Sequence, residues 1–189
     1  MKKPLSAFLI AVFIFWIRPL FAFEEKLEQV LESKYFTVYA YSGFNVNSLI
    51  PKLNFQYLLH LDRVDGDAAA TPSDILSKTL DALYLEISDI LDIHIYSFHG
   101  SIRIFVQQAS LHEALTELLV VGFEGPSLYL PEQNTIFISD PDLTLGVLGH
   151  EIAHAIISGF FVVPPPVKIQ EVLAGYVEYN LRKSTDTLP

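Results

Sequence analysis

The chain has 189 residues, no cysteine and a formal net charge of −10 at pH 7. Its hydrophobic content of 51%, with 13% aromatic residues, is typical of a folded domain and excludes a largely disordered chain. The lack of cysteine excludes disulfides and cysteine-based zinc fingers, and the acidic balance argues against nucleic acid or an anionic membrane surface as a partner.

The first 22 residues have the pattern of an export signal. Lys2 and Lys3 precede an apolar run from Leu5 to Ile17, and Ala22 is the small residue expected before a cleavage site. The run is shorter than the roughly 20 residues that cross a bilayer, so we expect cleavage and no stable membrane span afterwards; an uncleaved anchor is the alternative. Removal of residues 1–22 takes away three basic residues and no acidic ones, which changes the net charge from −10 to −13. The expected mature protein is a single domain, residues 23–189, that is periplasmic or secreted.

The N-terminal half of this domain is predicted to contain both strands and helices. Residues 23–33 are expected to form a short helix or a polar lead-in, residues 35–42 the first strand, and residues 47–62 a segment with leucines at helical spacing. Residues 64–70 are small and polar, so we expect a surface loop there. Thr71, Pro72 and Asp74 have the residue types of a helix N-terminus and predict a helix from Pro72 to about Leu91.

The second half carries the candidate site. A strand is expected at residues 101–107, a helix at 110–121, and a hairpin formed by strands 127–130 and 135–139. The sequence Asp-Pro-Asp at 140–142 predicts the start of a helix that ends at Ser158, with Gly159 as its stop. Three prolines at 164–166 then separate this helix from a last helix at 167–183.

The segment from His150 to His154 reads His-Glu-Ile-Ala-His and is the most informative motif in the chain. Histidines four residues apart lie on one helix face, so both imidazoles can reach one metal ion. Glu151 lies on the flank of this pair, where it can take a proton from a metal-activated water without being a ligand. Glu171, on the following helix, is a third candidate ligand, because a catalytic zinc has three protein ligands and one open position. The alternative is a helix that carries two histidines by chance.

Several residues near the motif have two interpretations. Gly146 and Gly149 indicate one of two things: another backbone or the substrate approaches closely, or the helices pack tightly. Ala174 and Gly175, on the face of the last helix that carries the candidate ligand, would let the two helices approach closely. Glu178 is expected either to accept a hydrogen bond from a ligand imidazole or to lie on a solvated face.

Two segments of the chain resemble the gluzincin metallopeptidases: His-Glu-Ile-Ala-His at 150–154 and Gln-Glu-Val-Leu-Ala-Gly-Tyr-Val-Glu-Tyr at 170–179. The second segment is most similar to the zinc aminopeptidase branch. The resemblance covers residues 127–179 and implies Zn²⁺ bound by His150, His154 and Glu171, with Glu151 as the catalytic base. It also implies an α+β, zincin-like fold, in which a small twisted mixed sheet packs on an active-site helix and a following glutamate-bearing helix. In this clan the edge strand ahead of the active-site helix holds the substrate in an extended form, and residues 127–139 match that region.

The chain departs from the family pattern in two respects. Val172 stands where many relatives have glycine after the ligand glutamate, and only eighteen residues follow Glu171. We therefore expect the chain to lack the C-terminal subdomain that in relatives often donates a tyrosine or histidine to the oxyanion. Tyr176 and Tyr179 are expected to point away from the face of Glu171. Tyr129 could donate to the oxyanion only if the hairpin lines the cleft.

The other histidines are not paired at ligand spacing, and surface or capping roles are expected for them: His60, His94, His99 and His112. His94 and His99, near Asp92, are the best remaining candidates for a site.

These patterns together predict an exported zinc-dependent peptidase that acts on a peptide or protein substrate. One rival is a zinc-binding scaffold that holds a peptide or protein partner in the cell envelope without cutting it, because no oxyanion donor is identified. A further rival is a small α+β adhesion or envelope protein that binds no metal.

Overall fold

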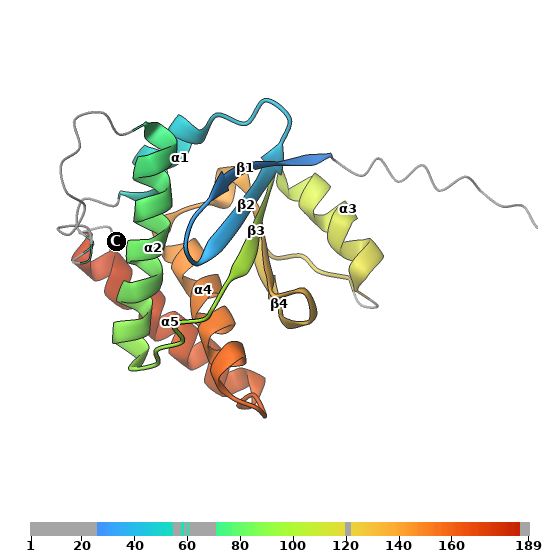
Figure 1. Cartoon of the computed structure of the whole chain (residues 1–189). Helices are drawn as coiled ribbons and strands as arrows, with labels where there is room; N and C mark the ends of the chain where they lie inside the picture. Colours follow the sequence, from blue (N-terminus) through green and yellow to red (C-terminus); the bar gives the residue numbers. More distant parts are fainter. Residues whose placement is uncertain (1–25, 55–57, 59, 61–70, 120–121, 186–189) are drawn as a thin grey trace, which may run out of the picture.

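The structure, a computed structural model, describes residues 26–54, 58, 60, 71–119 and 122–185. Within these residues the protein is α+β, with a mixed five-stranded sheet in the order β1-β2-β3-β5-β4 (Figure 1). The strands are β1 (Leu27–Glu32), β2 (Phe36–Tyr41), β3 (Gly100–Phe105), β4 (Ser127–Leu130) and β5 (Thr135–Ser139). The three central strands are parallel, and each edge strand pairs antiparallel with its neighbour.

Helices cover both faces of the sheet (Figure 1). The main core contains inward-facing residues of the sheet together with residues of α2 (Pro72–Leu91), α4 (Leu145–Phe160) and α5 (Val167–Ser184). A smaller cluster joins α3 (Gln108–Leu118) to the other face, through Phe105, Leu111, Leu115 and Phe137. Strand β4 forms the edge of the sheet beside α4, so the hairpin and the histidine-bearing helix are neighbours.

Several predicted elements are confirmed. Strand β2 lies within residues 35–42, the two hairpin strands have the predicted bounds, and α5 extends one residue beyond its predicted end. Helix α2 begins at Pro72 with a capping box, in which Thr71 Oγ1 accepts from the backbone N–H of Asp74 and the Asp74 carboxylate accepts from the N–H of Thr71. The strand predicted at 101–107 is β3, and the helix predicted at 110–121 is α3, which begins two residues earlier.

The described part of the 23–33 segment is strand β1, so the prediction of a helix or lead-in there was wrong. This strand is polar because it lies at an exposed edge, and an irregularity in its pairing between Gln29 and Leu31 interrupts the alternation that marks a strand. Among the described residues of the 47–62 segment, the helix is the short α1 (Leu49–Leu53), which stops where Asn54 adopts positive φ.

The predicted start and end of the histidine-bearing helix were also wrong. Residues Asp140–Asp142 form a separate 3-10 turn, and the backbone is extended at Leu143. Helix α4 begins at Leu145, where Thr144 Oγ1 accepts from the backbone N–H of Val147. It continues through Gly159 and ends at Phe160.

Two predictions lie outside the described residues: the export signal at 1–22 and the loop at 64–70. Among the described helices, none has the length and apolar character needed to span a bilayer.

Candidate metal centre

Helix α4 brings its two histidines together on one face. His150 and His154 are one turn apart, and their Nε2 atoms lie 3.2 Å from each other. Both imidazoles are largely shielded from solvent, with side-chain exposures of 22% and 15%. This arrangement follows from the spacing of four residues, as the sequence predicts.

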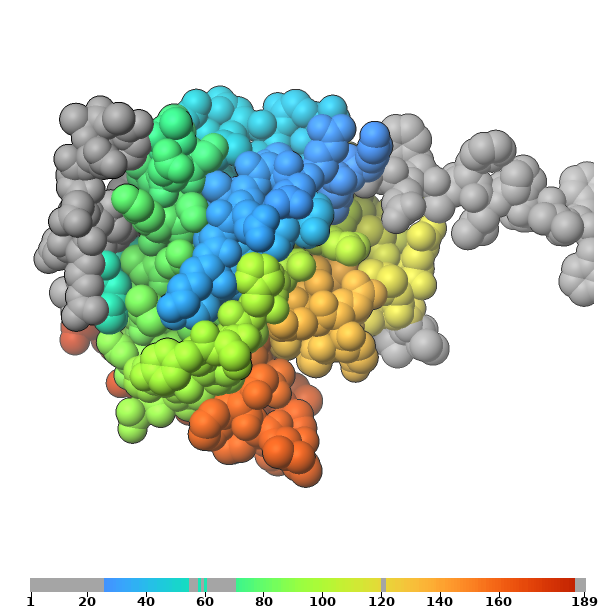
Figure 2. Space-filling view, in the orientation of Figure 1, coloured from blue at the N-terminus to red at the C-terminus, as the bar shows by residue number. Residues whose placement is uncertain are grey.

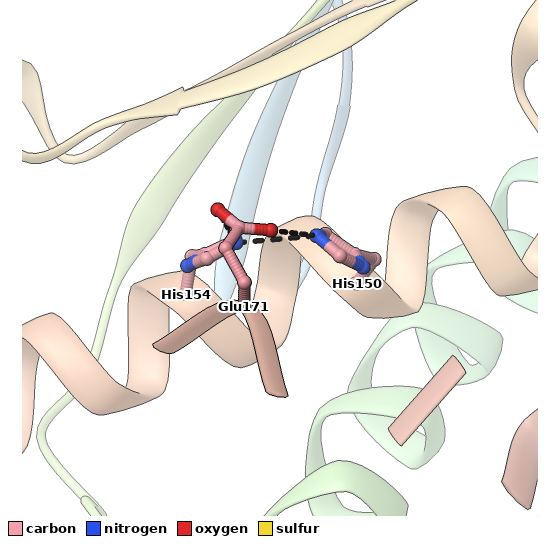
Figure 3. A group of neighbouring side chains, drawn as sticks. All are labelled: His150, His154 and Glu171. Atoms are coloured by element: carbon pink, nitrogen blue, oxygen red, sulfur yellow. Dashed lines mark hydrogen bonds and ion pairs between the residues drawn. The ribbon is translucent and has the colours of Figure 1, made fainter. Parts of the chain in front are cut away.

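Glu171 of α5 completes the group (Figure 3). Its Oε2 lies 3.4 Å from His150 Nε2, and its Oε1 lies 3.5 Å from His154 Nε2. In a tetrahedral zinc site with bonds of about 2.0–2.1 Å, ligand atoms lie about 3.3 Å from one another. The distances between the three side chains therefore suit a single small cation, and the donor atoms of all three lie within 4.8 Å of one another.

The close packing of α4 on α5 gives the ligands this spacing. A methyl group on Gly149 would overlap Leu181 Cδ1, and one on Gly146 would lie 3.2 Å from Arg182 Cγ. Of the two interpretations of these glycines, tight helix packing is therefore the one observed. On α5, Ala174 is fully buried, whereas a methyl group on Gly175 would meet nothing within 4 Å.

Both imidazoles have further polar partners on α5. Glu178 Oε2 lies 3.5 Å from His150 Nδ1, and its other oxygen lies 3.4 Å from Arg182 Nη1. Gln170 donates its side-chain N–H to the carbonyl oxygen of Pro165 at 2.8 Å and also hydrogen-bonds His154. Polar partners of this kind orient a metal-ligating imidazole, so that its other ring nitrogen faces the metal.

Glu151 is not part of the ligand group. Its side chain is buried, with only 6% of the residue exposed, and Ser127 Oγ donates to its Oε1 at 2.7 Å. Burial raises the pKa of this carboxyl and is the largest effect on it. The hydrogen bonds from Ser127 and the Tyr129 backbone, together with the two nearby imidazoles, lower the pKa by less. The site thus contains a carboxyl group with an increased affinity for protons beside the three candidate ligands.

Burial has the opposite effect on His154. It lowers the pKa of this imidazole and outweighs the carboxylates of Glu151 and Glu171, which raise the pKa. A neutral imidazole is the form that binds a metal ion. The environment of His154 therefore favours its ligand form.

The group opens into a cleft of about 520 Å³ between the hairpin and the two helices. Its walls are mainly apolar and include Phe123, Leu128, Val147 and Val167. Tyr129 lines the cleft, but its hydroxyl donates to Asn134 at 3.0 Å, and burial raises its pKa to about 12.

The two tyrosines of α5 lie outside this cleft. Tyr176 and Tyr179 are 54% and 51% exposed and are not among the cleft-lining residues, as their helical positions predict.

The remaining histidines form separate contacts. His60 and His94 each lie 2.8 Å from a carboxylate oxygen of Asp89. His99 contacts Thr37 Oγ1 and the carbonyl oxygen of Lys34, and His112 contacts the carbonyl oxygen of Gly125. Within the part of the chain that the structure describes, no second group of three side chains has metal-ligand spacing.

Sequence reasoning missed two residues that touch the group, Ser127 and Gln170. Ser127 reaches Glu151 across 24 positions of sequence, because the edge strand lies against α4. No local pattern marks either residue, since a serine in a strand and a glutamine in a helix are ordinary at their positions.

Comparisons with protein-family models, with curated proteins and with solved structures found no match to this chain.

Proposed function

We propose that this protein is an exported zinc-dependent peptidase with a zincin-like catalytic domain. The observation that carries the proposal is the convergence of His150, His154 and Glu171 beside a buried carboxyl, Glu151, in an open cleft. Two imidazoles and one carboxylate are a donor set typical of catalytic zinc, which keeps one position for water or substrate.

Zinc fits this donor set better than hard cations do. Hard cations such as Mg²⁺ and Ca²⁺ prefer oxygen ligands, whereas two of the three donors here are imidazole nitrogens. When bound, zinc would supply Lewis acidity, which polarises a carbonyl group and makes a water molecule easier to deprotonate.

The chain's own residues supply the proton transfer. Glu151 would accept a proton at its carboxylate from the attacking water and deliver it to the leaving amine. Its raised pKa suits this role, because a group that takes up and then releases a proton works best with a pKa nearer to the working pH. Ser127 would hold one carboxylate oxygen of Glu151 in place by donating to it.

The test is a comparison of Glu151→Gln with wild type, for both zinc content and peptide hydrolysis. We expect a loss of turnover of at least about 100-fold, because general-base catalysis contributes roughly 10²–10⁴-fold, while zinc stays stoichiometric. The matched control is Glu113→Gln on the exposed side of α3, which should leave the zinc content and the rate of peptide hydrolysis unchanged. Equal turnover by Glu151→Gln and wild type, with zinc bound, would refute the role of Glu151.

A second candidate is a zinc-binding scaffold that holds a peptide or protein partner without cutting it. It is favoured by one observation: the hydroxyl of Tyr129, the tyrosine that lines the cleft, donates to Asn134 Oδ1 and not into the cleft. A zinc-loaded protein that binds peptides in a broad library yet cleaves none would support this candidate over the peptidase.

A further inference from the structure

Exposed large apolar side chains concentrate in one part of the molecule, the end of α4, the connector that follows it and the outer face of α5. Val162 and Val163 in the connector are 100% and 80% exposed, and Val167 and Val172 on α5 are 71% and 63% exposed. We call the full set the apolar ridge: Phe160, Phe161, Val162, Val163, Val167, Ile169, Val172, Tyr176 and Tyr179. Solvent-exposed apolar groups that cluster in this way mark an interaction surface.

The part of the ridge on α5 is one continuous stripe. Ile169, Val172, Tyr176 and Tyr179 are separated by three, four and three residues, so they lie on one helix face. The opposite face packs into the core through Ala174, Val177 and Leu181. Helix α5 is therefore apolar on two sides, and the residues that the structure describes cover only one of them.

The charges around the stripe are positive, although the whole chain is acidic. Lys168 precedes Val172 by four residues and Lys183 follows Tyr179 by four, and both lysines are exposed. The two glutamates of α5 lie near the histidines of α4 instead. No aspartate or glutamate occurs between residues 152 and 170.

We propose that the apolar ridge docks on a lipid bilayer that contains anionic headgroups. An interfacial helix of this type places its apolar face at the boundary between headgroups and acyl chains, while lysines at its margins reach the headgroups. The net charge of −10 does not oppose this docking strongly. Charges more than about 10 Å from the membrane surface are largely screened by salt, so the local charge of the ridge decides the interaction.

The shape of the ridge favours a lipid surface over a second copy of the chain. The segment around the end of α4 projects from the body of the protein at the lower edge of Figure 2. A projecting tip of two phenylalanines and two valines suits insertion among lipids better than the flat seam of two paired helices. The ridge residues themselves carry no carboxylate that could pair with the lysines of a second copy. The nearby Glu171 faces the histidines of α4.

Because the chain contains no cysteine, a single introduced thiol can report on the ridge alone. We would label Val163→Cys and Val172→Cys in the full chain with an environment-sensitive dye, with Val106→Cys as the control at an exposed valine outside the ridge. Vesicles of phosphatidylcholine alone are compared with vesicles of equal parts phosphatidylcholine and phosphatidylglycerol. We expect a blue shift of emission at 163 and 172 on the anionic vesicles, a smaller one on neutral vesicles, and none at 106.

The charge requirement is tested by Lys168→Gln, with the exposed Lys78→Gln on α2 as the matched control. A lysine near an anionic surface contributes about 1 kcal/mol, so the first variant should bind anionic vesicles about fivefold more weakly, and the control should bind like wild type.

Dyes at 163 and 172 that stay in water on both kinds of vesicle would overturn the proposal. So would equal shifts on neutral and anionic vesicles, or a shift that appears without vesicles as protein concentration rises, which would indicate a second copy. None of these measurements needs zinc or turnover, so the outcome is independent of the proposed peptidase activity.

Discussion

Substituting Gly149 by alanine tests the packing that holds the candidate ligands together. The added methyl group would overlap Leu181 Cδ1, and Leu181 is fully buried, so it cannot move aside freely. Replacing a helical glycine by alanine gains about 1 kcal/mol, but overpacking a core costs about 1–3 kcal/mol. We expect the free energy of unfolding to fall by roughly 1 kcal/mol.

Gly175→Ala is the matched control, because it lies in α5 where a methyl group meets nothing within 4 Å. Without a clash, this variant should gain roughly 0.5–1 kcal/mol. The two variants should therefore differ by about 1.5–2 kcal/mol, or about 3–8 °C in Tm, since 1 kcal/mol corresponds to about 2–4 °C in a chain of this size. Thermal unfolding by circular dichroism measures the difference.

The same substitution should also weaken metal binding, because the ligands come from both helices and the methyl group pushes the helices apart. Zinc affinity is measured by competition with a chromophoric chelator. In the Leu181→Ala background, which removes the clashing atoms, Gly149→Ala should no longer destabilise the fold. If Gly149→Ala alone were as stabilising as Gly175→Ala and bound zinc as tightly as wild type, the inferred helix contact would be refuted.

Two further outcomes follow from the site. Ser127→Ala removes a hydrogen bond to the buried Glu151 and should lower the free energy of unfolding by about 1.5–3 kcal/mol, as measured with urea; Ser110→Ala, which loses only an exposed contact, should have little effect. Zinc at about 100 times its Kd should add about 2.7 kcal/mol, or roughly 5–10 °C in Tm. That zinc-dependent increase should disappear in His154→Ala and persist in His94→Ala, and its persistence in both would show that zinc binds elsewhere.

The sequence predicts best where a local rule and the tertiary environment agree. The capping residues at Thr71 and Asp74 form the expected contacts. The two hairpin strands have the predicted bounds because the turn residues Pro131 to Asn134, with Asn134 at positive φ, separate them. The spacing of His150 and His154 likewise depends only on helix geometry.

Prediction failed where two local signals competed or where a contact joined distant parts of the chain. Asp-Pro-Asp at 140–142 has the residue types of a helix start, but Thr144 provides the cap of α4 instead. Strand β1 resembled a polar lead-in because it lies at an edge of the sheet with little of it buried. The support that Ser127 gives to Glu151 depends on sheet order, which no local pattern contains.

The order of strands in the sheet also affects how the chain can fold while it is being synthesised. Strand β5 pairs with β3 and lies between it and β4, and both hairpin strands come late in the sequence. Among the described residues, the candidate ligands and their polar partners come from residue 127 or later. A nascent chain that emerges N-terminus first therefore carries three of the five strands, with β3 at an open edge, until β4 and β5 emerge, and the candidate ligands of α4 and α5 emerge later still.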